Sequence, residues 1–101
     1  MVSNAKLERK FQSDLIKELK TTFKGCMVIK QDPDYIQGIP DLIVLHNDKW
    51  AALEVKRSSD AKHQPNQDHY VSKMDEMSFS RFIYPENKEK VIHELQQVFD
   101  A

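Results

Sequence analysis

The chain has one cysteine, two glycines and no long run of apolar residues. The lone Cys26, which we expect to be a small core residue, excludes an internal disulfide, a cysteine-based zinc site and a four-cysteine iron–sulfur cluster. Two glycines are too few for a phosphate-binding loop of the P-loop or dinucleotide-binding kind, which disfavours nucleotide-cofactor enzymes. No segment approaches the about 18 apolar residues of a membrane span, and the first residues lack the apolar part of a signal peptide. We therefore expect a soluble, cytoplasmic protein with no membrane partner.

A length of 101 residues predicts one domain, spanning 1–101, with a single modest core. The net charge of −1 argues against a general binder of polyanions, which usually has a strongly basic domain. The charges are unevenly distributed, however. The first third is basic and the next stretch is acidic, through Lys6, Arg9, Lys10, Lys17, Lys20, Lys24 and Lys30, then Asp32, Asp34, Asp41 and Asp48. A local basic surface can therefore lie beside an acidic pocket.

Apolar periodicity and turn residues predict alternating helices and strands. The expected elements are a helix over 3–24, a strand over 26–30, a polar loop over 31–37, a hairpin with strands over 42–45 and 50–56, a helix over 65–77, a strand over 79–84 and a helix over 85–99. Because a helix joins the second hairpin strand to the strand that follows, these two strands should run parallel. The expected fold class is α/β, of the mixed α+β kind, with a mixed central sheet flanked by helices.

Each helix has an apolar face that we expect to pack on the sheet. These faces consist of Leu7, Phe11, Leu15, Ile16, Leu19 and Phe23, then Tyr70, Val71, Met74 and Met77, and finally Val91, Ile92, Leu95, Val98 and Phe99. Glu8 falls in the middle of the first apolar face. Burying a carboxylate is costly unless it is paired or bound to a cation, so Glu8 needs such a partner. The alternative is a glutamate near the helix start that reaches solvent or interacts with the helix dipole.

The hairpin carries a charged cluster whose geometry follows from its register. If Asn47 and Asp48 form the tip, paired residue numbers sum to about 95, which places Leu45 opposite Trp50 and Asp41 opposite Glu54. Residues that are directly opposed, or two apart on one strand, share a face of the sheet. The side chains of Asp41 and Glu54 should therefore lie on one side of the hairpin.

Lys56 should project to that same side. Two opposed carboxylates such as Asp41 and Glu54 repel each other unless a cation lies between them, and a divalent metal would supply that charge. Mg²⁺ prefers one or two carboxylates together with water and a substrate phosphate, while Lys56 could hold or polarise an attacking water. The alternative is an edge hairpin whose exposed face happens to be charged.

The chain resembles the PD-(D/E)xK nuclease superfamily, and more narrowly its small phage-type VRR-NUC branch. The resemblance rests on Glu8 in the first helix, Gly38-Ile39-Pro40-Asp41 before a strand, Glu54-Val55-Lys56 on the next strand, and Gln67-Asp68-His69-Tyr70 in the following helix. It covers most of the chain and implies the restriction-endonuclease-like αβββαβ core. It also implies a phage or bacterial protein of DNA replication, recombination or repair.

Position by position, the resemblance implies that Asp41 and Glu54 are metal ligands, that the Val55 carbonyl is a further ligand, and that Lys56 positions the water. The implied cofactor is Mg²⁺, with Mn²⁺ as a substitute. The implied activity is metal-dependent hydrolysis of DNA phosphodiester bonds, on branched substrates of the Holliday-junction type.

Two further residues belong to this implied site. Glu8 would complete the acidic cluster as another ligand, and Gln67 would orient phosphate or water, although a solvent-exposed glutamine is the plain alternative. Junction-resolving members of the superfamily are symmetric dimers, so the resemblance also implies a homodimer. The apolar face of the first helix is a candidate contact for it.

Two other functions fit the same residues. One is a nicking or flap-cutting nuclease of the same fold, which the sequence does not distinguish from a junction nuclease. The other is a non-catalytic DNA-binding module that retains the fold. The presence of Asp41, Glu54 and Lys56 together argues against the second, because a degenerate member would be expected to lack at least one of them.

Overall fold

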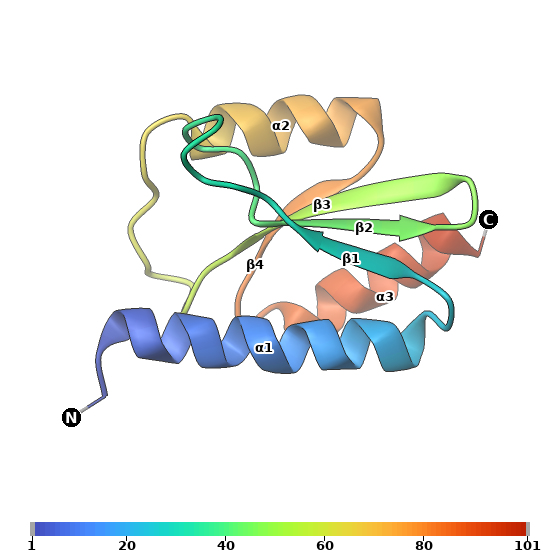
Figure 1. Cartoon of the computed structure of the whole chain (residues 1–101), viewed down its shortest axis with the longest axis horizontal. Helices are drawn as coiled ribbons and strands as arrows, with labels where there is room; N and C mark the ends of the chain where they lie inside the picture. The colour runs from blue at the N-terminus through green and yellow to red at the C-terminus, as the bar shows by residue number, and fades with distance from the viewer. Residues whose placement is uncertain (1, 101) are drawn as a thin grey trace.

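The computed structural model describes residues 2–100 and has three helices around one four-stranded sheet (Figure 1). In chain order the elements are α1 (Asn4–Thr22), β1 (Met27–Lys30), β2 (Leu42–His46), β3 (Lys49–Val55), α2 (Gln67–Met77), β4 (Ser80–Ile83) and α3 (Lys88–Phe99). The strands lie in the order β1-β2-β3-β4, with β1–β2 and β2–β3 antiparallel and β3–β4 parallel. The predicted mixed sheet and the parallel crossover through α2 are confirmed.

The hairpin register is also confirmed. Leu45 pairs with Trp50, and the pairs on either side keep the sum of 95 down to Leu42 and Leu53. The turn is the expected Asn47-Asp48 pair, and Asn47 adopts a positive φ of 55°, as the twist of a tight hairpin turn requires. This register directs alternate residues of β3 to opposite faces of the sheet.

One face of the sheet carries the main core. α1 and α3 cover this face, while α2 lies across β3 and β4 on the other side (Figure 1). Leu15 and Leu19 of α1, Leu53 of β3 and Leu95 of α3 are essentially inaccessible to solvent, and they belong to one cluster of buried residues. Burying each such side chain contributes roughly 1.5–3 kcal/mol.

Two side chains that were expected in the core are exposed, so those predictions are wrong. Leu7 is 44% exposed and Met77 is 68% exposed. Both lie near the end of a helix. Leu7 is in the first turns of α1, and Met77 is the last residue of α2. Helical periodicity continues to the end of a helix, whereas the surface that it packs against does not. Cys26 is half-buried beside the core, rather than inside it.

The exposed apolar surface lies on the sheet instead of on α1. Met27 and Ile29 of β1 and Leu45 of β2 are exposed, and Met27 pairs directly with Leu45. The apolar side chains of α1 pack in the core of the domain itself. Apart from Leu7, the apolar face of α1 therefore leaves little exposed surface for contact with a second subunit.

Candidate active site

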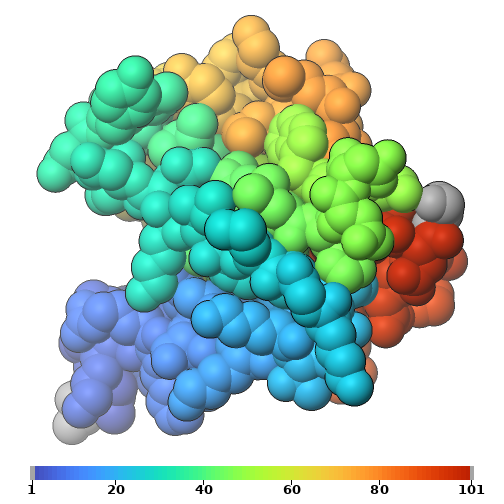
Figure 2. Space-filling model, turned by 45° about the vertical axis from the view of Figure 1, so that its right-hand side comes forward, coloured from blue at the N-terminus to red at the C-terminus, as the bar shows by residue number. Residues whose placement is uncertain are grey.

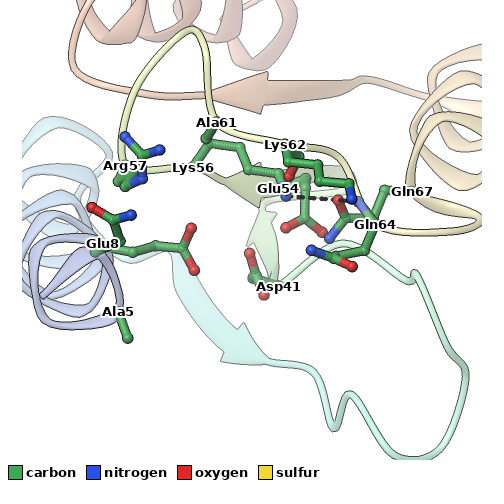
Figure 3. A pocket seen from close by; sticks show the side chains of 11 residues that line it. Ala5, Glu8, Asp41, Glu54, Lys56, Arg57, Ala61, Lys62, Gln64 and Gln67 are labelled. Carbon is green, nitrogen blue, oxygen red and sulfur yellow. Dashed lines mark hydrogen bonds between the residues drawn. The ribbon is translucent and has the colours of Figure 1, made fainter.

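The candidate site is a pocket of about 380 Å³ where α1 and α2 begin, at the end of β3. Figure 2 shows the same end of the molecule hollowed between the start of α1 and the segment that follows β1. Figure 3 shows the lining side chains, which come from α1, the hairpin, the loop over 57–66 and the start of α2. The lining residues are Asn4, Ala5, Glu8, Asp41, Glu54, Lys56, Arg57, Ala61, Lys62, Gln64 and Gln67.

Asp41 is held by its backbone and by its side chain. The last residue pair between β2 and β3 is Leu42–Leu53, and Asp41 lies one residue before β2. The predicted pairing of Asp41 with Glu54 in the sheet is therefore not formed. The Asp41 carboxylate Oδ2 instead accepts a 2.8 Å hydrogen bond from the backbone N–H of Val55, and the Asp41 carbonyl accepts one of 2.8 Å from the N–H of Gln31. These bonds place the Asp41 carboxylate beside the end of β3, next to Glu54.

Glu54 is a buried carboxyl group with a strongly perturbed acidity. It is only 3% exposed, and its pKa is raised to about 9, with burial as the largest cause. A side-chain hydrogen bond with Asp41 and the negative charge of Asp41 contribute to this rise in pKa, while the positive charge of Lys56 opposes it. A like charge this close disfavours the ionised form of Glu54.

Glu8 reaches the same pocket from α1. Figure 3 shows its carboxylate pointing across the pocket toward Asp41 and Glu54. Burial raises the pKa of Glu8 and the charge of Asp41 adds to the effect, whereas Lys56 and Arg57 act in the opposite direction. Glu8 is half-buried and electrostatically coupled to the hairpin acids, which favours a place in the pocket over a glutamate that simply faces solvent.

Lys56 is almost fully buried, with 5% of its surface exposed. Its Nζ donates hydrogen bonds of 2.7 Å to Gln67 Oε1 and 3.2 Å to the carbonyl oxygen of Lys62. Both acceptors are neutral, so the ammonium group keeps its positive charge for the acids and for any ligand in the pocket. An ammonium group has three donors, which leaves one N–H for a ligand.

Gln67 lies in the pocket, but its oxygen is already engaged. Oε1 accepts the bond from Lys56 and a second one of 2.8 Å from the backbone N–H of Gln64. Its amide oxygen is therefore committed to Lys56 and the start of α2, which leaves only its NH₂ group for the expected contact with phosphate or water.

Sequence reasoning missed Arg57, Lys62 and Gln64 as lining residues. They lie on the loop over 57–66, whose path follows no periodic pattern. The one available signal applied to Arg57 alone, which directly follows Lys56, because residues just beyond the end of a strand often line a site. The loop is held by contacts that no spacing predicts, such as the His63 ring stacked on Phe82 with centroids 4.0 Å apart.

The donor set of the pocket fits a small, hard divalent cation. Within residues 2–100, no three histidine, cysteine, aspartate or glutamate side chains are close enough to hold a metal ion by themselves. Mg²⁺ needs only one or two carboxylates when water and a substrate phosphate supply the remaining oxygens, and Asp41 and Glu54 provide two. Val55 is fully buried and does not line the pocket, so its expected role as a carbonyl ligand gains no support. Its observed contribution is the N–H bond to Asp41.

No helix among the described residues is long and apolar enough to cross a membrane. A scan against protein-family models finds no match for this chain, and a search of curated proteins finds none either.

Proposed function

We propose that this protein is a metal-dependent endonuclease that hydrolyses DNA phosphodiester bonds. We further propose that it acts on branched DNA of the Holliday-junction type, during phage or bacterial replication, recombination or repair. One observation carries the proposal: the half-buried Asp41 and the buried Glu54 share a pocket with the buried Lys56, whose ammonium group is hydrogen-bonded to neutral acceptors. This combination is costly for the fold alone, which is typical of a functional site.

In this proposal Asp41 and Glu54 hold Mg²⁺, for which Mn²⁺ can substitute, and Glu8 stands across the pocket as a third acid. The chemistry that the bound ion supplies is polarisation of the scissile phosphate and a lower pKa for the attacking water. Glu54 must release its proton before it can act as a ligand, because metal ligands bind in the deprotonated form. The Val55 N–H orients the Asp41 carboxylate, so that this ligand is preorganised.

Lys56 holds the attacking water or a non-bridging phosphate oxygen through its remaining N–H. Gln67 and the Lys62 carbonyl fix the lysine and so limit the positions that its ammonium group can take. A fixed positive charge aimed at the developing negative charge is worth far more in a buried site than in water. Lys56 is therefore proposed to contribute mainly to the rate of the chemical step.

The side chains of Arg57 and Lys62 line the same pocket and are proposed to contact phosphates on either side of the scissile bond. Together with the lysines and arginine of α1, they would give binding that is independent of sequence and weakened by salt.

We also propose that the protein acts as a homodimer, because cutting a two-fold symmetric junction requires two identical sites related by two-fold symmetry. The proposed contact is the row of Met27, Ile29 and Leu45, against the same row of a second copy. β1 is an edge strand, so its free side could also pair with β1 of that copy.

The proposal is tested by a cleavage assay with Mg²⁺ on four-way-junction, flap, nicked, single-stranded and linear duplex DNA. Wild type should cut the junction fastest, whereas Glu54→Gln and Lys56→Met should lower the rate by more than about 100-fold. Lys90→Ala is the matched control, because Lys90 is exposed on α3 and does not line the pocket.

Three other outcomes would redirect the proposal. Faster cutting of flaps or nicks would assign a flap or nicking nuclease. Binding without cleavage of any substrate would assign a non-catalytic module. If Glu54→Gln and Lys56→Met both cut DNA at the wild-type rate, the active site would lie outside this pocket.

A further inference from the structure

Gly38 lies directly against the residues that precede α2. A Cβ atom at Gly38 would come within 2.7 Å of the Asn66 Cβ and within 2.8 Å of the Pro65 carbonyl oxygen. Two non-bonded heavy atoms normally keep about 3.5–4.0 Å apart, so any side chain here would force the two segments apart. Both residues also have a positive φ, of 88° at Gly38 and 72° at Asn66.

The chain from Gly38 to Asp41 is too constrained to absorb such a displacement. The N–H of Ile39 donates a 3.3 Å bond to the carbonyl of Ile36, and Pro40 is fully buried with a φ fixed by its ring. The Asp41 carbonyl is bonded to the N–H of Gln31. A shift at Gly38 would therefore be transmitted to Asp41, three residues later.

On the α2 side of the Gly38–Asn66 contact, the next residue is Gln67, which binds Lys56. Asn66 immediately precedes Gln67, and its carbonyl accepts a 3.0 Å bond from the N–H of Tyr70 in the first turn of α2. The N–H of Gln67 is bonded to the Gln64 carbonyl at 3.2 Å. A shift of Asn66 would carry Gln67 with it and move the oxygen that holds Lys56.

We propose that Gly38 is a positioning residue: its lack of a side chain lets the Asp41 segment lie against Asn66, and this contact sets the spacing between Asp41 and the Gln67–Lys56 pair. Its importance for catalysis rests on the proposed nuclease function. The effect of Gly38 on the position of Asp41 does not depend on that function.

Gly25 provides a matched control for the backbone conformation. Its φ of 87° is nearly identical to that of Gly38, but a Cβ there would meet nothing within 4 Å. Gly25→Ala therefore carries the cost of a positive φ alone, whereas Gly38→Ala carries the same cost and also separates the two segments. If Gly38 were needed only for its turn, the two variants would behave alike.

Two measurements that need no nuclease activity test the proposal. Hydrogen exchange of the Val55 amide reports whether its bond to the Asp41 carboxylate survives, and calorimetry with Mn²⁺ reports the affinity of the acid pair. In Gly38→Ala we expect the Val55 amide to exchange at least about 10-fold faster relative to other β3 amides, and Mn²⁺ to bind about 10- to 100-fold more weakly. Gly25→Ala should match wild type in both, whatever its thermal stability.

Replacement of Asn66 supplies a rescue experiment and a safeguard against misfolding. Glycine at position 66 removes the 2.7 Å contact and tolerates the positive φ, while the 2.8 Å contacts with the Asn66 backbone carbon and the Pro65 carbonyl oxygen remain. Gly38→Ala with Asn66→Gly should therefore recover only part of the Mn²⁺ affinity. If Gly38→Ala alone does not fold, the double variant is compared with Gly25→Ala, and faster Val55 exchange is again expected.

Equal Val55 exchange and equal Mn²⁺ affinity in Gly38→Ala and Gly25→Ala would overturn the proposal. A wild-type protein that cuts no DNA would overturn the proposed function instead. The Val55 exchange comparison would still decide the role of Gly38 in that case.

Discussion

The ammonium group of Lys56 donates a 2.7 Å hydrogen bond to Gln67, eleven residues later in the chain. This bond joins the end of β3 to the first turn of α2 across the pocket. Because Gln67 is neutral, it fixes the position of Lys56 without cancelling its charge, which a carboxylate at position 67 would do. The pocket thus keeps a positioned cation beside two acids.

The first prediction concerns this bond. Gln67→Leu should lower kcat for Mg²⁺-dependent cleavage by about 10- to 100-fold, because Lys56 loses the acceptor that positions it. KM should change by no more than about twofold, since Arg57 and Lys62, the proposed phosphate contacts, remain. Steady-state kinetics on the preferred DNA substrate would measure both values.

Gln96→Leu on the exposed side of α3 is the control for this prediction and should leave both constants unchanged. A Gln67→Leu variant with an unchanged kcat and a raised KM would show that Gln67 contacts DNA, rather than acting through Lys56.

The second prediction concerns pH and the stability of the metal-free protein. Glu54 has an ordinary pKa of 4.5 in the unfolded chain and about 9 in the fold. Its contribution to stability is therefore fully present below about pH 4.5 and is lost as the pH rises toward 9. The loss is at most about 1.4 kcal/mol per pH unit, and less where water entry or relaxation screens the charge. Urea unfolding of wild type and Glu54→Gln at about pH 5, 7 and 9 would measure it.

Glu54→Gln mimics the protonated acid, so it should be increasingly more stable than wild type as the pH rises. Glu89→Gln, at an exposed position of α3, should show no such trend. A difference between wild type and Glu54→Gln that does not vary with pH would mean that Glu54 ionises normally.

The third prediction concerns assembly. If Met27, Ile29 and Leu45 form the dimer contact, Ile29→Asp should weaken self-association by at least about 10-fold, equivalent to about 1.4 kcal/mol, while the domain remains folded. Sedimentation across a micromolar concentration series would measure the dissociation constant. Tyr35→Ser removes another large exposed side chain, which lies outside this row, and should have no effect. A wild-type protein that stays monomeric and still cuts at full rate would exclude the dimer.

Local sequence rules predicted the sheet well, because its determinants are local. The Asn47-Asp48 turn sets the hairpin register, so the approach of Asp41 to Glu54 could be derived from residue numbers alone. The odd position of Glu8 on an apolar face correctly indicated that it belongs to the pocket.

Contacts between distant segments could not be predicted in this way. The bonds of Lys56 to Gln67 and to the Lys62 carbonyl depend on the path of an aperiodic loop. The close approach of Gly38 to Asn66 depends on how two turns pack, which no periodicity encodes. Met77 was assigned to the core because helical spacing does not reveal where the sheet beneath a helix ends.

The most direct test of the central claim is calorimetric titration of the metal-free protein with Mn²⁺ at about pH 7, in two buffers of different ionisation enthalpy. If Asp41 and Glu54 form a metal site, wild type should bind Mn²⁺ and release about one proton, because Glu54 is protonated until the ion arrives. Glu54→Gln should bind at least about 10-fold more weakly and release no proton from this position. Binding that is unaffected by Glu54→Gln, or no binding by wild type at millimolar Mn²⁺, would contradict the assignment of this pocket as a metal-dependent active site.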